Sequence, residues 1–213
     1  MNDTFTEIAD KCQQSFEARH NARENALKQA RLLTRCSAHA IRAVHRKENK
    51  LAQKLLGEAR EITEQLKKDL KRYPSLYYSG YTQDAIKEYA EAQLTYHLIE
   101  DLPLPMPEQL GIEHATYLKG LAESIGELRR KCLDILRHGY SQDAERLLSL
   151  MDEIYSLLVT MDFPDAITHG LRRQTDQVRG IMERTRADLT LSLREERLQQ
   201  SLRSLEKRLP PES

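Results

Sequence analysis

The first third of the chain contains almost no residue that interrupts an α-helix. No proline occurs between Asp3 and Arg72, and Gly57 is the only glycine in that stretch. Apolar side chains recur there at the three- and four-residue spacing that places them on one face of a helix. They are Leu27, Ala30, Leu33, Ala40, Ile41, Val44, Leu51, Leu55, Ala59, Ile62, Leu66 and Leu70. The pattern predicts two long helices that break near residues 47–50, with room for a short helix before them.

Proline and glycine also mark where the later helices begin and end. Pro74 and Gly80 punctuate a loop, after which Thr82 is a candidate N-cap. Alternating prolines make residues 102–114 an extended connector. Helices are predicted at residues 83–101, at residues 113–138 with Gly139 as the C-cap, after a capping Ser141, and from residues 165–168 to about residue 207. The predicted fold is all-α, one domain over residues 1–213 with six to seven long antiparallel helices and a frayed end at residues 208–213.

Composition limits the classes of protein to which the chain can belong. Its 213 residues suffice for one domain with a sizeable core, and 39% apolar with 31% charged residues is typical of a soluble helical protein. The formal net charge is zero, which excludes a uniformly basic nucleic-acid binder. A local basic surface is still compatible with this composition.

Cysteine usage and hydropathy indicate the compartment. The three cysteines are an odd number and form no C-x-x-C or Cys/His cluster, which favours reduced thiols. The first residues lack the basic region and apolar run of a signal peptide, and no apolar stretch approaches the ~20 residues of a membrane span. We therefore expect a cytoplasmic protein with no membrane partner.

One predicted helix is unusually poor in charge and yet carries a pair of acids. Between Tyr89 and Ile99 the only formally charged residue is Glu91, and Glu88 stands three residues before it on the same helical face. Carboxylates in an apolar setting repel each other and lose hydration worth several kcal/mol, so they need compensation. A cationic side chain, a shared proton or a metal ion would each provide it. We expect the pair to line an internal groove.

The next long helix offers a second acidic pair. Glu123 and Glu127 are four residues apart on one face, and Gly120 and Gly126 flank Glu123. A glycine within a helix costs about 1 kcal/mol relative to alanine, so two of them suggest that something approaches closely. Carboxylates from two packed helices form the oxygen-rich environment that Mg²⁺ or Mn²⁺ prefers. The four glutamates are the candidate metal-binding and catalytic residues.

Acidic pairs at helical spacing also occur on solvated surfaces. Glu58 and Glu61 form such a pair in this chain. A solvated face therefore stands as the alternative to a metal site for the acids at residues 88–91 and 123–127.

These segments resemble the translin family. The stretch "KEYAEA", the proline-rich connector after it, and "YLKGLAESIGELRRKCL" follow the order and spacing seen in that family, and most closely in its catalytic branch, translin-associated factor X. The stretch "SFEARHNARENALKQARLLTRCSAHAIRAVHR" is similar to the family's long second helix. The resemblance extends from about Phe16 to Leu193.

The resemblance implies a seven-helix fold, closed hollow oligomers such as octamers or hexamers, and a metal-dependent endoribonuclease that cleaves single-stranded RNA. It places the family's acids on Glu88, Glu91 and Glu123, with Glu127 at a further acidic position. Arg130 matches a basic position tied to RNA binding. The third acid is commonly aspartate in the family, and the longer glutamate here could shift the metal.

A second departure from the family concerns RNA binding. Where the catalytic branch has a Lys/Arg pair midway along helix two, this sequence has Ala38 and His39. Basic side chains nevertheless recur on that helix at three- and four-residue spacing, where they could contact phosphates. The stripe comprises Arg31, Arg35, His39, Arg42 and Arg46. Ion pairs with neighbouring helices are the alternative role of these side chains.

The predicted reaction is hydrolysis of a phosphodiester bond. A divalent cation on the acids would activate a water molecule and offset charge on the phosphoryl oxygens, with Glu127 as a further ligand or general base. Attack by water would leave a 5′-phosphate and a 3′-hydroxyl.

Three other functions are alternatives to this one. An all-α nucleotide pyrophosphohydrolase normally pairs E-x-x-E with E-x-x-D, whereas the second pair here is Glu123-x-x-x-Glu127. A di-iron bundle needs two E-x-x-H motifs, and only Glu17-x-x-His20 fits. An oligomeric protein that binds single-stranded RNA or DNA without cleaving it is the main alternative.

Overall fold

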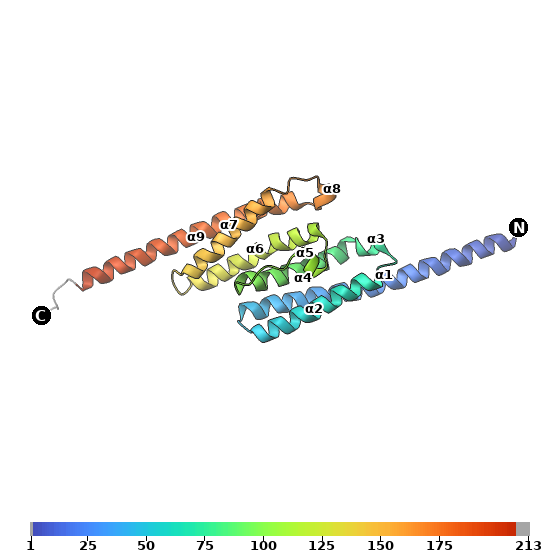
Figure 1. Ribbon diagram of the computed structural model, residues 1–213, viewed down its shortest axis with the longest axis horizontal. Coiled ribbons are helices and arrows are strands. Elements are labelled where there is room, and N and C mark those ends of the chain that lie inside the picture. Colours follow the sequence, from blue (N-terminus) through green and yellow to red (C-terminus); the bar gives the residue numbers. More distant parts are fainter. Residues whose placement is uncertain (1, 208–213) are drawn as a thin grey trace. The chain divides into compact units, whose positions relative to one another are not determined.

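The computed structural model describes residues 2–207. That range contains helices and no strands, so the predicted all-α fold is confirmed (Figure 1). The long helices are α1 (Asn2–His45), α2 (Asn49–Asp69), α4 (Gly80–Ile99), α6 (His114–Leu136), α7 (Gln142–Val159) and α9 (Leu171–Glu206). The short ones are α3 (Pro74–Tyr77), α5 (Pro107–Leu110) and α8 (Asp165–Thr168), of four residues each. No helix in the described range is long and apolar enough to cross a lipid bilayer.

The described residues form two compact units. Unit 1 comprises residues 2–96 and 105–120, and unit 2 comprises residues 97–104 and 121–207. Helices α4 and α6 each begin in unit 1 and end in unit 2. The organisation of residues 1–213 as one domain stays a prediction, and its frayed end at residues 208–213 lies outside the described residues.

Helices α1 and α2 of unit 1 lie side by side as an antiparallel hairpin (Figure 1). The predicted break near residues 47–50 is confirmed, because α1 ends at His45, Lys47 has a positive φ of 59°, and α2 begins at Asn49. No separate short helix precedes them, since α1 is continuous from Asn2. The buried side chains of the two helices are small or branched and include Ala30, Leu33, Ala40, Ala52, Ala59 and Leu66.

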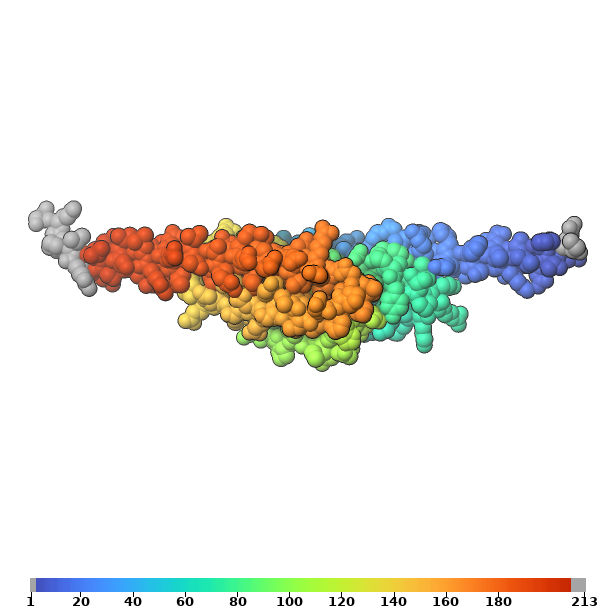
Figure 2. All heavy atoms as spheres, turned by 90° about the horizontal axis from the view of Figure 1, so that it is seen from above, coloured from blue at the N-terminus to red at the C-terminus, as the bar shows by residue number. Residues whose placement is uncertain are grey.

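The beginning of α1 and the end of α9 carry exposed apolar side chains. Figure 2 shows the first part of α1, in blue, extending beyond the rest of unit 1. Phe5, Ile8 and Phe16 there are 67%, 52% and 72% exposed. On α9 the exposed apolar residues are Leu191, Leu198, Leu202 and Leu205. Each terminal helix thus presents apolar surface that its own unit does not cover.

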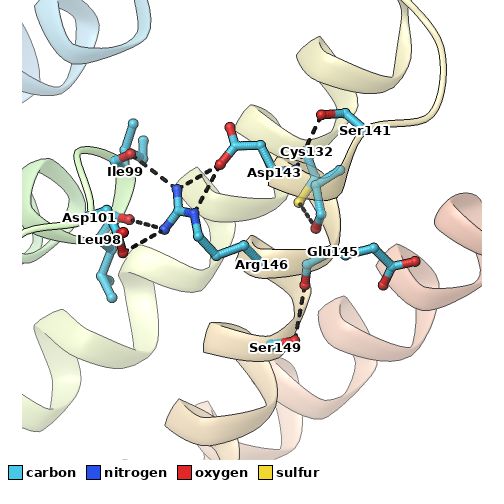
Figure 3. A network of polar contacts seen from close by, with 10 residues as sticks. Leu98, Ile99, Asp101, Cys132, Ser141, Asp143, Glu145, Arg146 and Ser149 are labelled. Carbon is cyan, nitrogen blue, oxygen red and sulfur yellow. Dashed lines mark hydrogen bonds and ion pairs between the residues drawn. The ribbon is translucent and has the colours of Figure 1, made fainter.

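In unit 2, one arginine caps the end of a helix on which it does not lie (Figure 3). Arg146 of α7 donates to the carbonyl oxygens of Leu98 (3.1 Å) and Ile99 (3.3 Å), the last residues of α4. Its guanidinium also bonds to Asp101 (3.3 Å) and Asp143 (3.0 Å). The last carbonyls of a helix lack partners within it, and a cation there is favoured by the helix dipole. Arg146 thereby joins α4 and α7.

Three predicted boundaries were wrong for identifiable reasons. Thr82 does not cap α4, which already begins at Gly80; its hydroxyl donates to the carbonyl of Leu76 (2.8 Å). The connector is not extended throughout, because Pro107 starts the short helix α5. The last helix begins at Leu171, since His169 and Gly170 adopt positive φ and separate it from α8. The capping role of Ser141 is confirmed, because its hydroxyl accepts from the Asp143 amide (3.2 Å).

Candidate metal centre and basic groove

Glu88 and Glu91 lie together on α4 of unit 1. Both side chains are half-buried, and a carboxylate oxygen of one lies within 4.8 Å of a carboxylate oxygen of the other. Nζ of Lys87 lies 3.5 Å from Oε1 of Glu88, and the Lys87 side chain is only 14% exposed. The pair is therefore partly buried beside one ammonium group, and the internal groove that the sequence predicts around it stays a prediction.

The sequence of α4 explains why the two acids share a partly buried face. Ala85, Ile86, Tyr89 and Ala90 are each 2% exposed or less and anchor the helix in the core. Glu88 and Glu91 lie at the edge of this apolar surface, where their side chains are neither fully buried nor fully exposed to solvent. Partial burial strengthens their mutual repulsion and increases the benefit of a bound cation.

Gly120 of α6 packs directly against the helical turn that carries the acids. A Cβ at Gly120 would lie 2.7 Å from Cβ of Ala90. The same atom would lie 3.0 Å from the Glu91 amide nitrogen and 3.1 Å from the Lys87 carbonyl oxygen. The expectation of a close approach is therefore confirmed at Gly120, and what approaches is the backbone of α4. At Gly126 the expectation is not met among residues 2–207, because none of their atoms lies within 4 Å of the corresponding position.

Glu123 lies on the part of α6 that belongs to unit 2. It is half-buried, and its Oε1 accepts a hydrogen bond from Nε2 of Gln174 on α9 (3.1 Å). Glu127 follows one turn later and forms an ion pair with Arg130, with 3.6 Å between Oε2 and Nη1. Gln174 is a partner of a candidate acid that the sequence did not reveal.

The sequence prediction named Arg130 as an RNA-binding residue and gave no role to its neighbour Arg129. The guanidinium of Arg129 donates to the hydroxyl of Thr185 (3.0 Å) and pairs with Asp188 (2.9 Å). Arg129 therefore fastens α6 to α9, whereas the exposed Arg130 side chain is available to solvent and to Glu127. Nothing local in "ELRRKC" distinguishes these two roles.

The predicted basic stripe on α1 divides between two grooves of unit 1. Arg31, Arg35 and Arg42 line a groove of about 440 Å³ with Thr34 and Tyr81, and no acidic residue lines it. These three arginines form no ion pair within residues 2–207. The side-chain oxygen of Tyr81 is shielded from solvent and has no hydrogen-bond partner among those residues.

His39 does not line the first groove. It lies with Arg42, Arg46, Leu51 and Leu55 in a second groove of about 450 Å³ beside the turn between α1 and α2. Glu48 also lines this second groove, so its charge is mixed. The first groove, which we call the arginine groove, is the more uniformly basic of the two.

Comparisons with known proteins agree with this architecture. None of the protein-family models matches the chain. It is 31% identical over 189 residues, 87% of this chain and 83% of the relative, to an uncharacterised protein of Methanocaldococcus jannaschii. The crystal structure of AfC3PO, from Archaeoglobus, is similar with a TM-score of 0.80 and 32% identity, covering 87% of this chain and 96% of that one.

Two further structures are similar over nearly the same length. AfC3PO in complex with duplex RNA matches with a TM-score of 0.78 and 31% identity, covering 87% of this chain and 96% of its own. Apo-NeC3PO, from Nematostella, has a TM-score of 0.79 at 22% identity with 86% and 96% covered, which shows a shared fold. The all-helical fold and these matches show a helical protein of the translin type. Within that class, the chain belongs to the C3PO family.

Proposed function

We propose that this protein is a divalent-metal-dependent endoribonuclease that hydrolyses single-stranded RNA within a closed homo-oligomer. The observation that carries the proposal is the half-buried acidic pair on α4, Glu88 and Glu91, with their carboxylate oxygens within 4.8 Å of each other. Membership of the C3PO family supports RNA as the ligand, because AfC3PO has been solved with a duplex RNA.

The donor set fits a hard divalent cation. Glu88 and Glu91 offer carboxylate oxygens, which Mg²⁺ and Mn²⁺ prefer, and no sulfur or imidazole is among the proposed ligands. Two half-buried carboxylates this close together repel each other, although Lys87 lies beside Glu88. A bound cation would offset the remaining repulsion in this partly buried setting.

Glu123 is the proposed third ligand. The support comes from helix continuity: Glu123 follows Gly120 by three residues on α6, and residues three apart share a helical face. Gly120 is the residue whose missing side chain lets α6 contact the turn of α4 at Ala90 and Glu91. The glutamate that follows by one turn is therefore proposed to point toward the same cation.

Each side chain then has a defined task. When bound, the cation supplies Lewis acidity for a phosphoryl oxygen and lowers the pKa of a water ligand. Glu88, Glu91 and Glu123 would hold it, and Glu127 would orient the attacking water or accept its proton. Water forms a new P–O bond while the P–O3′ bond breaks. The products carry a 5′-phosphate and a 3′-hydroxyl, and the 3′ oxygen takes up a proton.

The arginine groove is the proposed binding site for the RNA backbone. Arg31, Arg35 and Arg42 are spaced along one face of α1 and lack acidic partners, so they are available to phosphates. The shielded hydroxyl of Tyr81 adds a hydrogen-bond donor in the same groove. Arg130 and His39, which lie outside the arginine groove, are proposed as further contacts.

Exposed apolar residues support the oligomer. Phe5, Ile8 and Phe16 at the start of α1 and the leucines near the end of α9 are surfaces that a second copy would bury. The proposed assembly is an octamer or a hexamer. Its size is measured directly by sedimentation or by light scattering.

Binding without cleavage is the second candidate function. The observation that favours it is Lys87, which lies 3.5 Å from Glu88 and partly neutralises the acids without a metal. In that case the protein would hold RNA in its oligomer and the acids would be structural. Cleavage assays separate the two functions.

The deciding experiment uses end-labelled RNA, single-stranded and duplex, with Mg²⁺, Mn²⁺ or EDTA. The proposal predicts cleavage of the single strand that requires the metal, yields 5′-phosphate ends and is lost in Glu91→Ala. Equal cleavage by the wild type and Glu91→Ala would remove the catalytic assignment. Binding by both proteins with cleavage by neither would select the second candidate.

A further inference from the structure

Glu123 is held by a carboxamide from another helix of unit 2. Nε2 of Gln174, on the second turn of α9, donates to Oε1 of Glu123 at 3.1 Å. A carboxylate accepts hydrogen bonds and donates none, so the NH₂ end of the amide is the end that faces it. The oxygen end of Gln174 is consequently turned away from that contact.

This oxygen has no partner of its own. Oε1 of Gln174 is shielded from solvent and accepts no hydrogen bond from any residue between 2 and 207. Buried polar atoms in native proteins are nearly always bonded, to protein or to ordered water. This acceptor, on the same amide group that binds Glu123, is therefore available to a donor that residues 2–207 do not supply.

We propose that Gln174 is a positioning residue for the metal site, an inference that rests on the proposed function. Its Nε2 restrains the Glu123 carboxylate, and its Oε1 accepts a hydrogen bond from a water molecule in the hydration shell of the bound cation. Mg²⁺ keeps several waters when it binds to proteins, so such a donor is available.

The Glu123 side chain is long and flexible, so a hydrogen bond that restrains it should favour metal binding. Glutamate has one more rotatable bond than aspartate, so a freely rotating glutamate loses more conformational entropy when it binds a metal. The hydrogen bond from α9 removes part of that freedom before the metal arrives. Partners of this kind around metal ligands typically contribute 10- to 100-fold to metal affinity, so we expect an effect of about that size.

The test compares Mn²⁺ affinity, measured by the loss of the free-ion electron paramagnetic resonance signal, in Gln174→Met and Gln177→Met. Gln177 is exposed and lies one turn further along α9, so it is a matched control. We expect about 10- to 100-fold weaker Mn²⁺ binding in Gln174→Met and wild-type binding in Gln177→Met. Gln174→Asn keeps the amide on a shorter arm, and it is expected to weaken binding as well. Circular dichroism verifies that each variant folds.

A double variant shows whether Gln174 acts through Glu123. In a Glu123→Ala background, the part of the effect that acts through the carboxylate should disappear, so Gln174→Met should weaken Mn²⁺ binding by a smaller factor there than in the wild-type background. A full effect in that background would overturn the positioning role, because a merely structural contribution adds independently.

The outcomes separate this inference from the function on which it rests. Mn²⁺ binding that is lost in Glu91→Ala but unchanged in Gln174→Met would overturn the role of Gln174 alone. Absence of Mn²⁺ binding in the wild type, or binding unaffected by Glu91→Ala, would overturn both proposals.

Discussion

Gly120 and Ala90 are in such close contact that a Cβ on the glycine would lie 2.7 Å from that of the alanine. The backbone of α4 lies just behind, with the Glu91 amide nitrogen 3.0 Å from the same position. A side chain at residue 120 therefore cannot be accommodated without moving one helix. Gly120 therefore sets the distance between α4 and the first part of α6, both within unit 1.

Gly120→Ala should destabilise the protein although alanine favours helix. The gain of about 1 kcal/mol in helix propensity is outweighed by overpacking, which typically costs about 1–3 kcal/mol. Gly126→Ala is the matched control, because no atom of the described part of the chain lies within 4 Å of its Cβ position. We expect a lower urea midpoint for the first variant and an equal or higher one for the second. Equal stabilisation by both would show that the α4–α6 contact is looser than described.

Arg146→Lys should weaken unit 2 despite keeping the charge. One ammonium group cannot reproduce the planar arrangement that donates to the carbonyls of Leu98 and Ile99 and also to two aspartates. Loss of the donor to these carbonyls should lower the free energy of unfolding by about 1–2 kcal/mol. Urea titration measures this change. Arg137→Lys, at an exposed position, serves as the control with a change below about 0.5 kcal/mol. Similar small changes in both variants would contradict the capping role.

Ionisation of Cys132 should make the free energy of unfolding depend on pH in the alkaline range. Burial raises the pKa of this fully buried thiol from 9.0 to about 11, and Asp143 contributes to the shift. The unfolded thiol ionises first, so the stability it contributes is complete below pH 9 and is lost as the pH rises through about 11.

The comparison with Cys132→Ala isolates this titration from that of the tyrosines. The excess stability of the wild type over the variant should be about 2 kcal/mol smaller at about pH 10.5 than at about pH 8.5. Chemical denaturation at the two pH values measures it. An excess that does not change with pH would show that the thiol is not desolvated in the folded state.

Arg35→Ala should weaken RNA binding and reduce its dependence on salt. Each phosphate contact that is lost lowers the slope of log K against log salt by about 0.7 for a single strand. Filter binding in EDTA measures this slope without cleavage. Arg60→Ala is the control, because Arg60 lies on α2 and already pairs with Glu64 at 3.2 Å. An unchanged slope in Arg35→Ala would remove the arginine groove from the binding site.

Features encoded locally were predictable from the sequence. The break between α1 and α2, the cap at Ser141 and the close contact at Gly120 follow from helix periodicity and from the special properties of single residues. The acidic pair was found because its helix is otherwise poor in charge.

Features that depend on tertiary packing were not predictable. The bond between Gln174 and Glu123 joins residues 51 apart in sequence, and no periodicity marks it. Thr82 was misassigned because its hydroxyl bonds back to Leu76, six residues earlier, rather than to the start of its own helix. The division of the basic stripe into two grooves likewise depends on Tyr81 and Leu51, which come from other helices.

The most direct measurement is an anomalous difference map from a crystal of the protein soaked in Mn²⁺. The account predicts a peak at roughly 2.2 Å from carboxylate oxygens of Glu88, Glu91 and Glu123 that disappears in Glu91→Ala. A map without a peak at these residues, with the ammonium group of Lys87 drawn between the two acids of α4 instead, would contradict it.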